Sequence, residues 1–91
     1  MSLLVVDIGT SGVRSAIVRP DATIAVEHRQ EVLPDTPAPG LVEFDATRMA
    51  AAALATARAA LAEVGQIDGV GVATQRASTI VWDRATGEPV A

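Results

Sequence analysis

The stretch VVDIGTSGVRSAIV, residues 5–18, places an aspartate near the end of an apolar run, follows it with a glycine-rich turn and then becomes apolar again. The run over residues 3–8 is typical of a strand that is covered on both faces. Gly9 and Gly12 bracket the turn, because glycine adopts positive φ at no steric cost. Residues 13–19 are rich in β-branched side chains and roughly alternate, which predicts a second strand antiparallel to the first.

The chain beyond this hairpin predicts a third strand and then a loop. The proline and aspartate at residues 20–21 favour a tight turn. Residues 23–32 predict a strand with Ile24 and Val26 facing the core. Three strands joined by tight turns are antiparallel neighbours. The prolines and glycine of residues 33–41 exclude regular structure.

A helix is predicted over residues 46–64, with Asp45 as its N-cap and Gly65 as its stop. The apolar positions expected to face the sheet at helical spacing are Met49, Ala53, Leu54, Ala57, Leu61 and Val64. Residues 67–74 and 78–83 predict a fourth and a fifth strand. The pattern therefore predicts an α/β fold: a five-stranded mixed sheet with strands one to three antiparallel, strand four parallel to strand one, and one long helix.

Composition excludes several classes of function. The 91 residues suffice for one small domain, and 49% of them are apolar, which is not the composition of a disordered tail. The net charge is −4 and there is no lysine, so we do not expect a nucleic-acid partner. The absence of cysteine removes disulfides and thiolate metal sites. Neither a signal peptide nor a membrane-spanning apolar run is recognisable, and we expect a cytoplasmic protein with no membrane partner.

The turn between the first two strands is the strongest candidate for chemistry. Glycines at a turn let backbone N–H groups converge on an anion, and the hydroxyls of Thr10 and Ser11 add donors. Asp7, at the end of the strand, can hold Mg²⁺ through water. The alternative is an Asx turn, in which Asp7 only accepts hydrogen bonds from nearby backbone N–H groups. The spacing alone favours neither interpretation.

Three further polar residues lie near predicted strand ends. Arg14, two residues past the turn, can reach a phosphate bound there, although an exposed strand arginine is equally ordinary. Gln75 and Arg76 follow the fourth strand, where ligands of α/β sheets gather, and can form hydrogen bonds with a polyhydroxy substrate. The alternative is a solvated turn, which the sequence alone favours.

These residues carry a resemblance to a known family. The stretch at residues 5–18 resembles the first phosphate motif of the superfamily of sugar kinases, heat-shock proteins and actin. PGLVEFD at residues 39–45 and IDGVGVATQRASTIVWDRATGEPV at residues 67–90 look like the opening of the FGGY carbohydrate kinases, most of all their glycerol-kinase branch. The resemblance runs from Leu4 to the end of the chain, and the whole series is much more specific than the first motif alone.

The resemblance implies a partial ribonuclease H-like, actin-like ATPase domain from a protein with two lobes around a cleft. It implies ATP and Mg²⁺ as cofactors and a sugar or polyol whose hydroxyl accepts the γ-phosphate. By position, the residues implied to bind the nucleotide are Gly9, Thr10, Ser11 and Arg14, those implied to bind the substrate are Gln75 and Arg76, and the residue implied near the metal is Asp7.

Two departures from the glycerol-kinase pattern bear on the substrate. Ala77 stands where glycerol kinases have a glutamate that binds the polyol, and the Met-His pair of xylulose kinases is missing as well. We therefore expect glycerol to be a poorer substrate than a longer polyol or a ketose. Leu41 replaces a usual tryptophan, which we interpret as a packing change.

Members of the family are several times longer, and their catalytic base lies beyond the part that this sequence resembles. We therefore interpret residues 1–91 as the N-terminal part of the first actin-like lobe, with no catalytic residue of its own and no activity alone. We expect such a piece to self-associate through apolar patches and an unpaired sheet edge. The alternative interpretation is a non-enzymatic actin-like module for binding or assembly.

Overall fold

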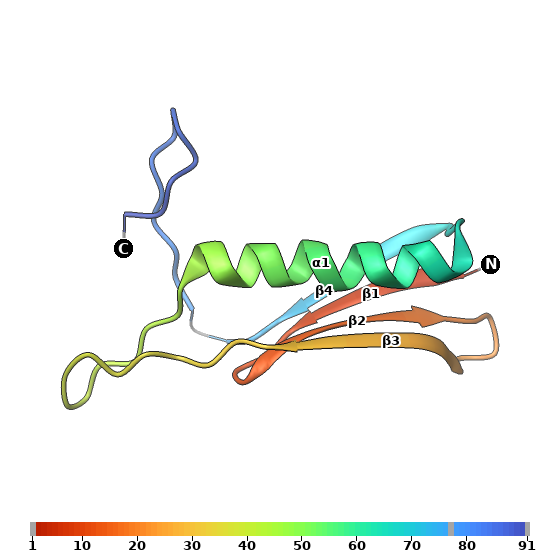
Figure 1. Ribbon diagram of the computed structural model, residues 1–91, viewed down its shortest axis with the longest axis horizontal. Coiled ribbons are helices and arrows are strands. Elements are labelled where there is room, and N and C mark those ends of the chain that lie inside the picture. Colours follow the sequence, from red (N-terminus) through yellow and green to blue (C-terminus); the bar gives the residue numbers. More distant parts are fainter. Residues whose placement is uncertain (1, 77, 91) are drawn as a thin grey trace.

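The computed structural model describes residues 2–76 and 78–90, in which one helix lies across one face of a four-stranded sheet (Figure 1). In chain order the elements are β1 (Leu3–Ile8), β2 (Gly12–Val18), β3 (Ile24–Glu31), α1 (Ala46–Val64) and β4 (Gly69–Thr74). The strand order is β3-β2-β1-β4. The predicted helix and the first four predicted strands are confirmed, with boundaries that differ by at most two residues.

The pairing of the strands confirms the predicted topology. β1 pairs with β2, and β2 with β3, in antiparallel register, whereas β1 and β4 are parallel. Parallel strands run in the same direction, so the residues that follow β1 and those that follow β4 emerge at the same end of the sheet. Ile8 and Thr74 are partners at that end.

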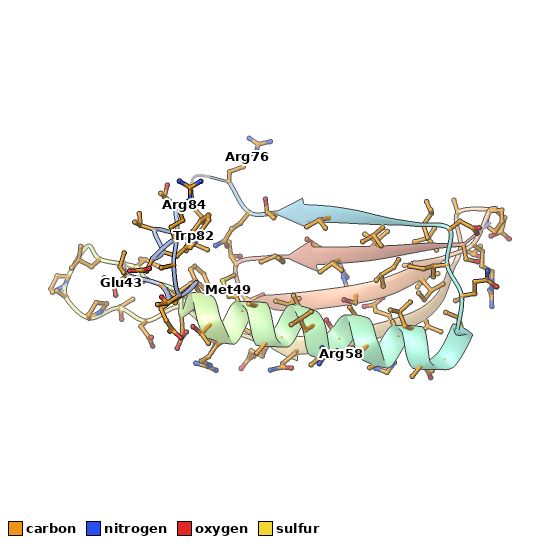
Figure 2. All side chains as sticks on the ribbon, turned by 90° about the horizontal axis from the view of Figure 1, so that it is seen from above. Glu43, Met49, Arg58, Arg76, Trp82 and Arg84 are labelled. Carbon is orange, nitrogen blue, oxygen red and sulfur yellow. The ribbon has the colours of Figure 1, made fainter. Side chains whose placement is uncertain are left out.

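Capping residues define α1 at both ends. The Asp45 carboxylate accepts a hydrogen bond from the Arg48 N–H at 3.1 Å, and the Gly65 N–H donates to the Leu61 carbonyl at 2.7 Å. Gly65 has φ of 76°, which only glycine adopts readily. The helix packs on β1, β2 and β3 and does not contact β4 among the described residues (Figure 2). It is also not long and apolar enough to cross a membrane.

The face of α1 that meets the sheet is displaced from the predicted one, although Met49, Ala53, Ala57 and Leu61 lie on it as predicted. Its buried residues are Met49, Ala52, Thr56 and Ala60. The prediction is wrong for Leu54, which is 55% exposed, and for Val64, which is 37% exposed. Ala52, Thr56 and Ala60 are small enough to let the helix approach the sheet closely, whereas Leu54 and Val64 lie outside the contact.

The expectation that Ile24 faces the core is also wrong, because that side chain is 56% exposed. The register between β2 and β3 shifts between Ile17 and Val18, so that Ile17 pairs with Val26 and Val18 with Ile24. A bulge of this kind places an extra residue, Ala25, in one strand and breaks the alternation of faces. Ala25 and Val26 pack against the core in its place.

Residues 78–83 do not form the predicted fifth strand of the sheet. The described part of this segment pairs with the end of the chain instead, through an isolated antiparallel bridge between Trp82 and Pro89. The Asp83 carboxylate accepts the Ala85 N–H at 2.8 Å and stabilises the turn that connects Trp82 to Pro89. An apolar β-branched run favours an extended chain but does not select the partner with which it pairs.

A buried pair of hydroxyls joins the centre of the sheet to α1. Ser15 on β2 is fully buried, and its Oγ lies 2.8 Å from Oγ1 of Thr56. The Thr56 hydroxyl donates to the Ala52 carbonyl at 2.9 Å, so its oxygen accepts the Ser15 proton. Both buried hydroxyls therefore have a hydrogen-bond partner, and the pair fixes the helix at one position along β2.

Thr56→Val is expected to lower the free energy of unfolding by about 1–3 kcal/mol, because it keeps the shape and leaves the Ser15 hydroxyl buried without an acceptor. Thr47→Val, at an exposed site on the same helix, is the matched control. Adding Ser15→Ala to Thr56→Val should recover part of the loss. Urea unfolding measures all three, and a Thr56→Val protein as stable as the control would contradict the role of the pair.

Candidate phosphate and substrate site

The turn between β1 and β2 presents free hydrogen-bond donors. The Gly9 N–H donates to the Gly12 carbonyl at 2.9 Å and closes the turn, and the Ser11 carbonyl accepts the Val32 N–H at 3.2 Å. Thr10 and Ser11 lie exposed at the tip. Among the described residues, no hydrogen bond engages the N–H groups or hydroxyls of these two residues, so four donors remain available to an anion.

The backbone conformation of the two glycines in this turn differs from the prediction. Neither Gly9 nor Gly12 has a positive φ. Gly12 instead lies against β3, where an added Cβ would come within 2.7 Å of the Gln30 carbonyl oxygen. The absence of a side chain therefore lets the turn pack closely on the neighbouring strand.

Asp7 and Arg14 form an ion pair beside the turn. They are direct partners in the β1–β2 register, and the Arg14 Nη2 donates to the Asp7 Oδ2 at 3.1 Å. Val6 and Ile8 pack in the core under α1, so Asp7 between them projects from the opposite face of the sheet. Its side chain is 43% exposed and remains accessible to a ligand.

The contacts of Asp7 speak against one of the two interpretations, the Asx turn. In the part of the chain that the structure describes, no backbone N–H donates to the Asp7 carboxylate, so Asp7 does not form an Asx turn. Such a turn occurs at Asp21 instead. There the hydroxyl and the backbone N–H of Thr23 both donate to the carboxylate and hold the pKa of Asp21 below its ordinary value.

Gln75 lies next to the turn, at the end of β4. Its N–H donates to the Ile8 carbonyl at 3.0 Å, which continues the parallel pairing one residue beyond the strand. Its side-chain Nε2 donates to the Ser78 hydroxyl at 2.8 Å, and its Oε1 is buried without a partner among the described residues. Gln75 therefore links the end of β1, just before the turn, to the segment that follows β4 through hydrogen bonds of its backbone and its side chain.

Arg76 is exposed and extends away from the sheet beyond the end of β4 (Figure 2). The structure brings Gln75 to the turn, but no hydrogen bond or ion pair joins Arg76 to another described residue. Ala77, the departure from the glycerol-kinase pattern, lies outside the described residues. Arg76 therefore remains available to a ligand at the same end of the sheet as the turn.

The carboxylates near the turn fit a magnesium ion that is held mainly by water and by the phosphate oxygens of a bound nucleotide. No group of three or more potential ligating side chains occurs within residues 2–76 and 78–90. Mg²⁺ usually keeps several waters and binds through one or two carboxylates together with phosphate oxygens. Asp7, an accessible carboxylate at the end of β1 beside the turn, fits that pattern.

One residue of this site was not predicted from the sequence. Glu27 on β3 lies with its Oε1 3.7 Å from Nη1 of Arg14. From the sequence alone, Asp7 was the one carboxylate expected near the turn. The signal was present in the alternation, because Glu27, Arg14 and Asp7 all occupy outward positions on neighbouring strands.

The fold and the site together define a class. An antiparallel hairpin with a glycine-containing turn, a crossover helix and a fourth strand parallel to the first are the opening elements of an actin-like lobe. Two solved structures share this arrangement over almost the whole chain. A glycerol kinase from Plasmodium falciparum with ADP superposes with a TM-score of 0.93 at 20% identity over 99% of this chain, and a xylulose kinase from Rhodospirillum rubrum with 0.91 at 20% identity over 100%.

The chain belongs to the FGGY family of carbohydrate kinases, whose N-terminal domain matches residues 2–91. Among curated relatives, it is 39% identical to a glycerol kinase from Afipia carboxidovorans and 41% identical to one from Verminephrobacter eiseniae, in each case over 97% of this chain. It spans 18% of the length of each of these two relatives and 19% of each of the two solved structures.

Gly12→Ala is expected to destabilise the hairpin by about 1–3 kcal/mol, because the new methyl group forces β3 away from the turn. Gly71→Ala on β4 is the matched control, since a Cβ there meets no atom within 4 Å. Urea unfolding of the two variants measures the difference. Equal stability of both would show that the close approach of Gly12 to Gln30 is unimportant.

Proposed function

We propose that the protein to which this chain belongs is an ATP-dependent carbohydrate or polyol kinase, which transfers the γ-phosphoryl group of ATP to a hydroxyl of its substrate. Membership of the FGGY family supports the reaction class. The observation that carries the proposal is the parallel pairing of β1 with β4. This pairing sets the anion-binding turn beside Gln75 and Arg76, so that a phosphate and a polyhydroxy ligand can meet at one end of the sheet.

The residues of the turn would bind the terminal phosphates of the nucleotide. The free N–H groups and hydroxyls of Thr10 and Ser11 would donate to phosphate oxygens. Arg14 would add a guanidinium that forms a bidentate pair of hydrogen bonds with a phosphate. Asp7 would hold Mg²⁺, which neutralises negative charge on the phosphates when bound. Phosphoryl transfer depends mainly on such positioning and charge stabilisation.

Gln75 and Arg76 would bind the substrate. An exposed guanidinium and a side-chain amide offer several donors to the hydroxyls of a sugar or polyol. Ala77 supplies no carboxylate at the position where the glycerol-kinase resemblance implies one. We therefore propose a longer polyol or a ketose, and not glycerol, as the preferred substrate.

No residue of the chain is assigned as the base that orients the attacking hydroxyl. In-line transfer needs such a base and a nucleotide held from both sides. We therefore propose that residues 1–91 do not transfer phosphate by themselves. Self-association of the isolated chain remains a prediction.

Asp7→Asn in the full-length protein is expected to lower kcat by about 100-fold or more, because it removes the carboxylate that would hold the metal. Stability should change little, since exposed ion pairs contribute weakly. Asp35→Asn makes the same charge change at an exposed loop position and should leave kcat unaffected. Turnover of Asp7→Asn within a few-fold of the unchanged protein would refute the role.

Arg76→Ala in the full-length protein is expected to raise KM for the sugar or polyol about tenfold or more and to leave KM for ATP nearly unchanged, because it removes charged hydrogen bonds to the substrate. Arg58→Ala, on the exposed side of α1, is the matched control (Figure 2). A selective rise in KM for ATP would move Arg76 to the nucleotide side. The same assay over a panel of polyols and ketoses tests the substrate, and a clear preference for glycerol would overturn that part of the proposal.

A further inference from the structure

Arg14 lies between two carboxylates on the face of the sheet that α1 does not cover. Its Nη2 is 3.1 Å from the Asp7 Oδ2, and its Nη1 is 3.7 Å from the Glu27 Oε1. The three side chains are between 39% and 49% exposed. They therefore form one accessible row of alternating charge across β1, β2 and β3.

The register shows on which side of Arg14 the second carboxylate lies. Gly12, at the turn, pairs with Glu31 on β3, Arg14 pairs with Arg29, and Ala16 pairs with Glu27. Glu27 is thus the diagonal neighbour of Arg14 on the side away from the turn. A guanidinium that contacts Glu27 is drawn along the sheet, away from the tip where the free donors lie.

The residue directly opposite Arg14 reinforces this position. Arg29 is a like charge in direct register, and such pairs repel. Arg29 has no ion-pair partner within the described ranges. Arg14 is therefore repelled from the position straight across on β3 and attracted toward Asp7 and Glu27.

Binding of a phosphate at the turn would change the partners of Arg14. A guanidinium that reaches a phosphate at residues 9–12 must leave the far side of the row, where Glu27 lies. A contact made in the free protein and lost in the complex lowers the affinity for the ligand by the strength of that contact. Glu27 therefore acts against phosphate binding through Arg14, although it touches no phosphate itself.

We propose that Glu27 is a positioning residue that holds Arg14 away from the turn in the free protein and so weakens nucleotide binding. The proposal rests on the proposed function, because it takes the phosphates of a nucleotide as the ligand of the turn. When the nucleotide leaves, Glu27 recovers the guanidinium, which favours release of the product nucleotide.

The test is Glu27→Gln in the full-length protein, with the dissociation constant for ADP measured by equilibrium titration in the presence of Mg²⁺. The proposal expects ADP to bind about two- to five-fold more tightly, the range that a weak exposed ion pair supplies. KM for ATP should fall by a similar factor, while KM for the sugar or polyol and the melting temperature stay nearly unchanged. A merely structural role would move the melting temperature and both KM values together.

Glu31→Gln is the matched control for long-range charge. It makes the same change on the same strand and the same face, and its register partner is Gly12, so it lies nearer the turn than Glu27 does. If loss of a negative charge were the whole effect, Glu31→Gln would tighten ADP binding at least as much. The proposal expects the smaller change from Glu31→Gln.

The decisive comparison repeats the Glu27→Gln change in a protein that already carries Arg14→Ala. In that variant Glu27→Gln should no longer change the affinity for ADP, because the residue through which Glu27 acts is gone. An equal effect of Glu27→Gln with and without Arg14, or weaker ADP binding in Glu27→Gln alone, would overturn the inference while leaving the proposed function intact. Failure of the unchanged protein to bind ADP or ATP would overturn both.

Discussion

The parallel pairing of β1 with β4 is the constraint on which the candidate site depends. It carries two segments that are distant in sequence to the same end of the sheet, and the hydrogen bond from the Gln75 N–H to the Ile8 carbonyl extends the pairing to the edge of the turn. α1 makes this pairing possible, because a parallel connection needs a crossover. The alanine-lined contact and the Ser15–Thr56 hydroxyl pair then set how closely and at what point the helix crosses the sheet.

The two faces of the sheet divide structural and chemical roles. The face under α1 holds the buried side chains, including Val13 and Ile17, which stabilise the domain by removing apolar surface from water. The opposite face carries the row of Asp7, Arg14 and Glu27, whose exposed ion pairs add little to stability. Charges on that face can therefore change partners when a ligand binds, without disturbing the core that holds the strands in register.

Local signals predicted most of the fold, and tertiary context decided the rest. The helix boundaries follow from Asp45 and Gly65, whose capping chemistry acts within one turn of the chain. The exposure of Ile24 depends on a bulge between strands, and the self-pairing of residues 81–90 depends on which partner is within reach. Neither is encoded in the alternation of a single segment.

The sequence predicted where residues of the candidate site lie, but not the contacts between them. Asp7, Thr10, Ser11 and Gln75 were identified from strand ends and turn chemistry, and the structure places all four at one end of the sheet. Glu27 was missed, because the alternation gives only its face, and a diagonal contact across strands also depends on the register between them. The need for Gly12 was recognised for the wrong reason, since close approach of two backbones is invisible before the strands are paired.

The separation in sequence between the two halves of the site has a consequence for folding. The β1–β2 hairpin closes through neighbouring residues, whereas β4 joins β1 through contacts such as that between the Ser2 N–H and the Asp68 carboxylate, 66 residues apart. Local pairs form quickly, and distant pairs form only after the entropy of a long loop has been lost. We therefore expect the turn at residues 9–12 to take shape early, and the full candidate site to form only when β4 docks. A folding intermediate that lacks β4 would hold a complete turn without Gln75 and Arg76 beside it.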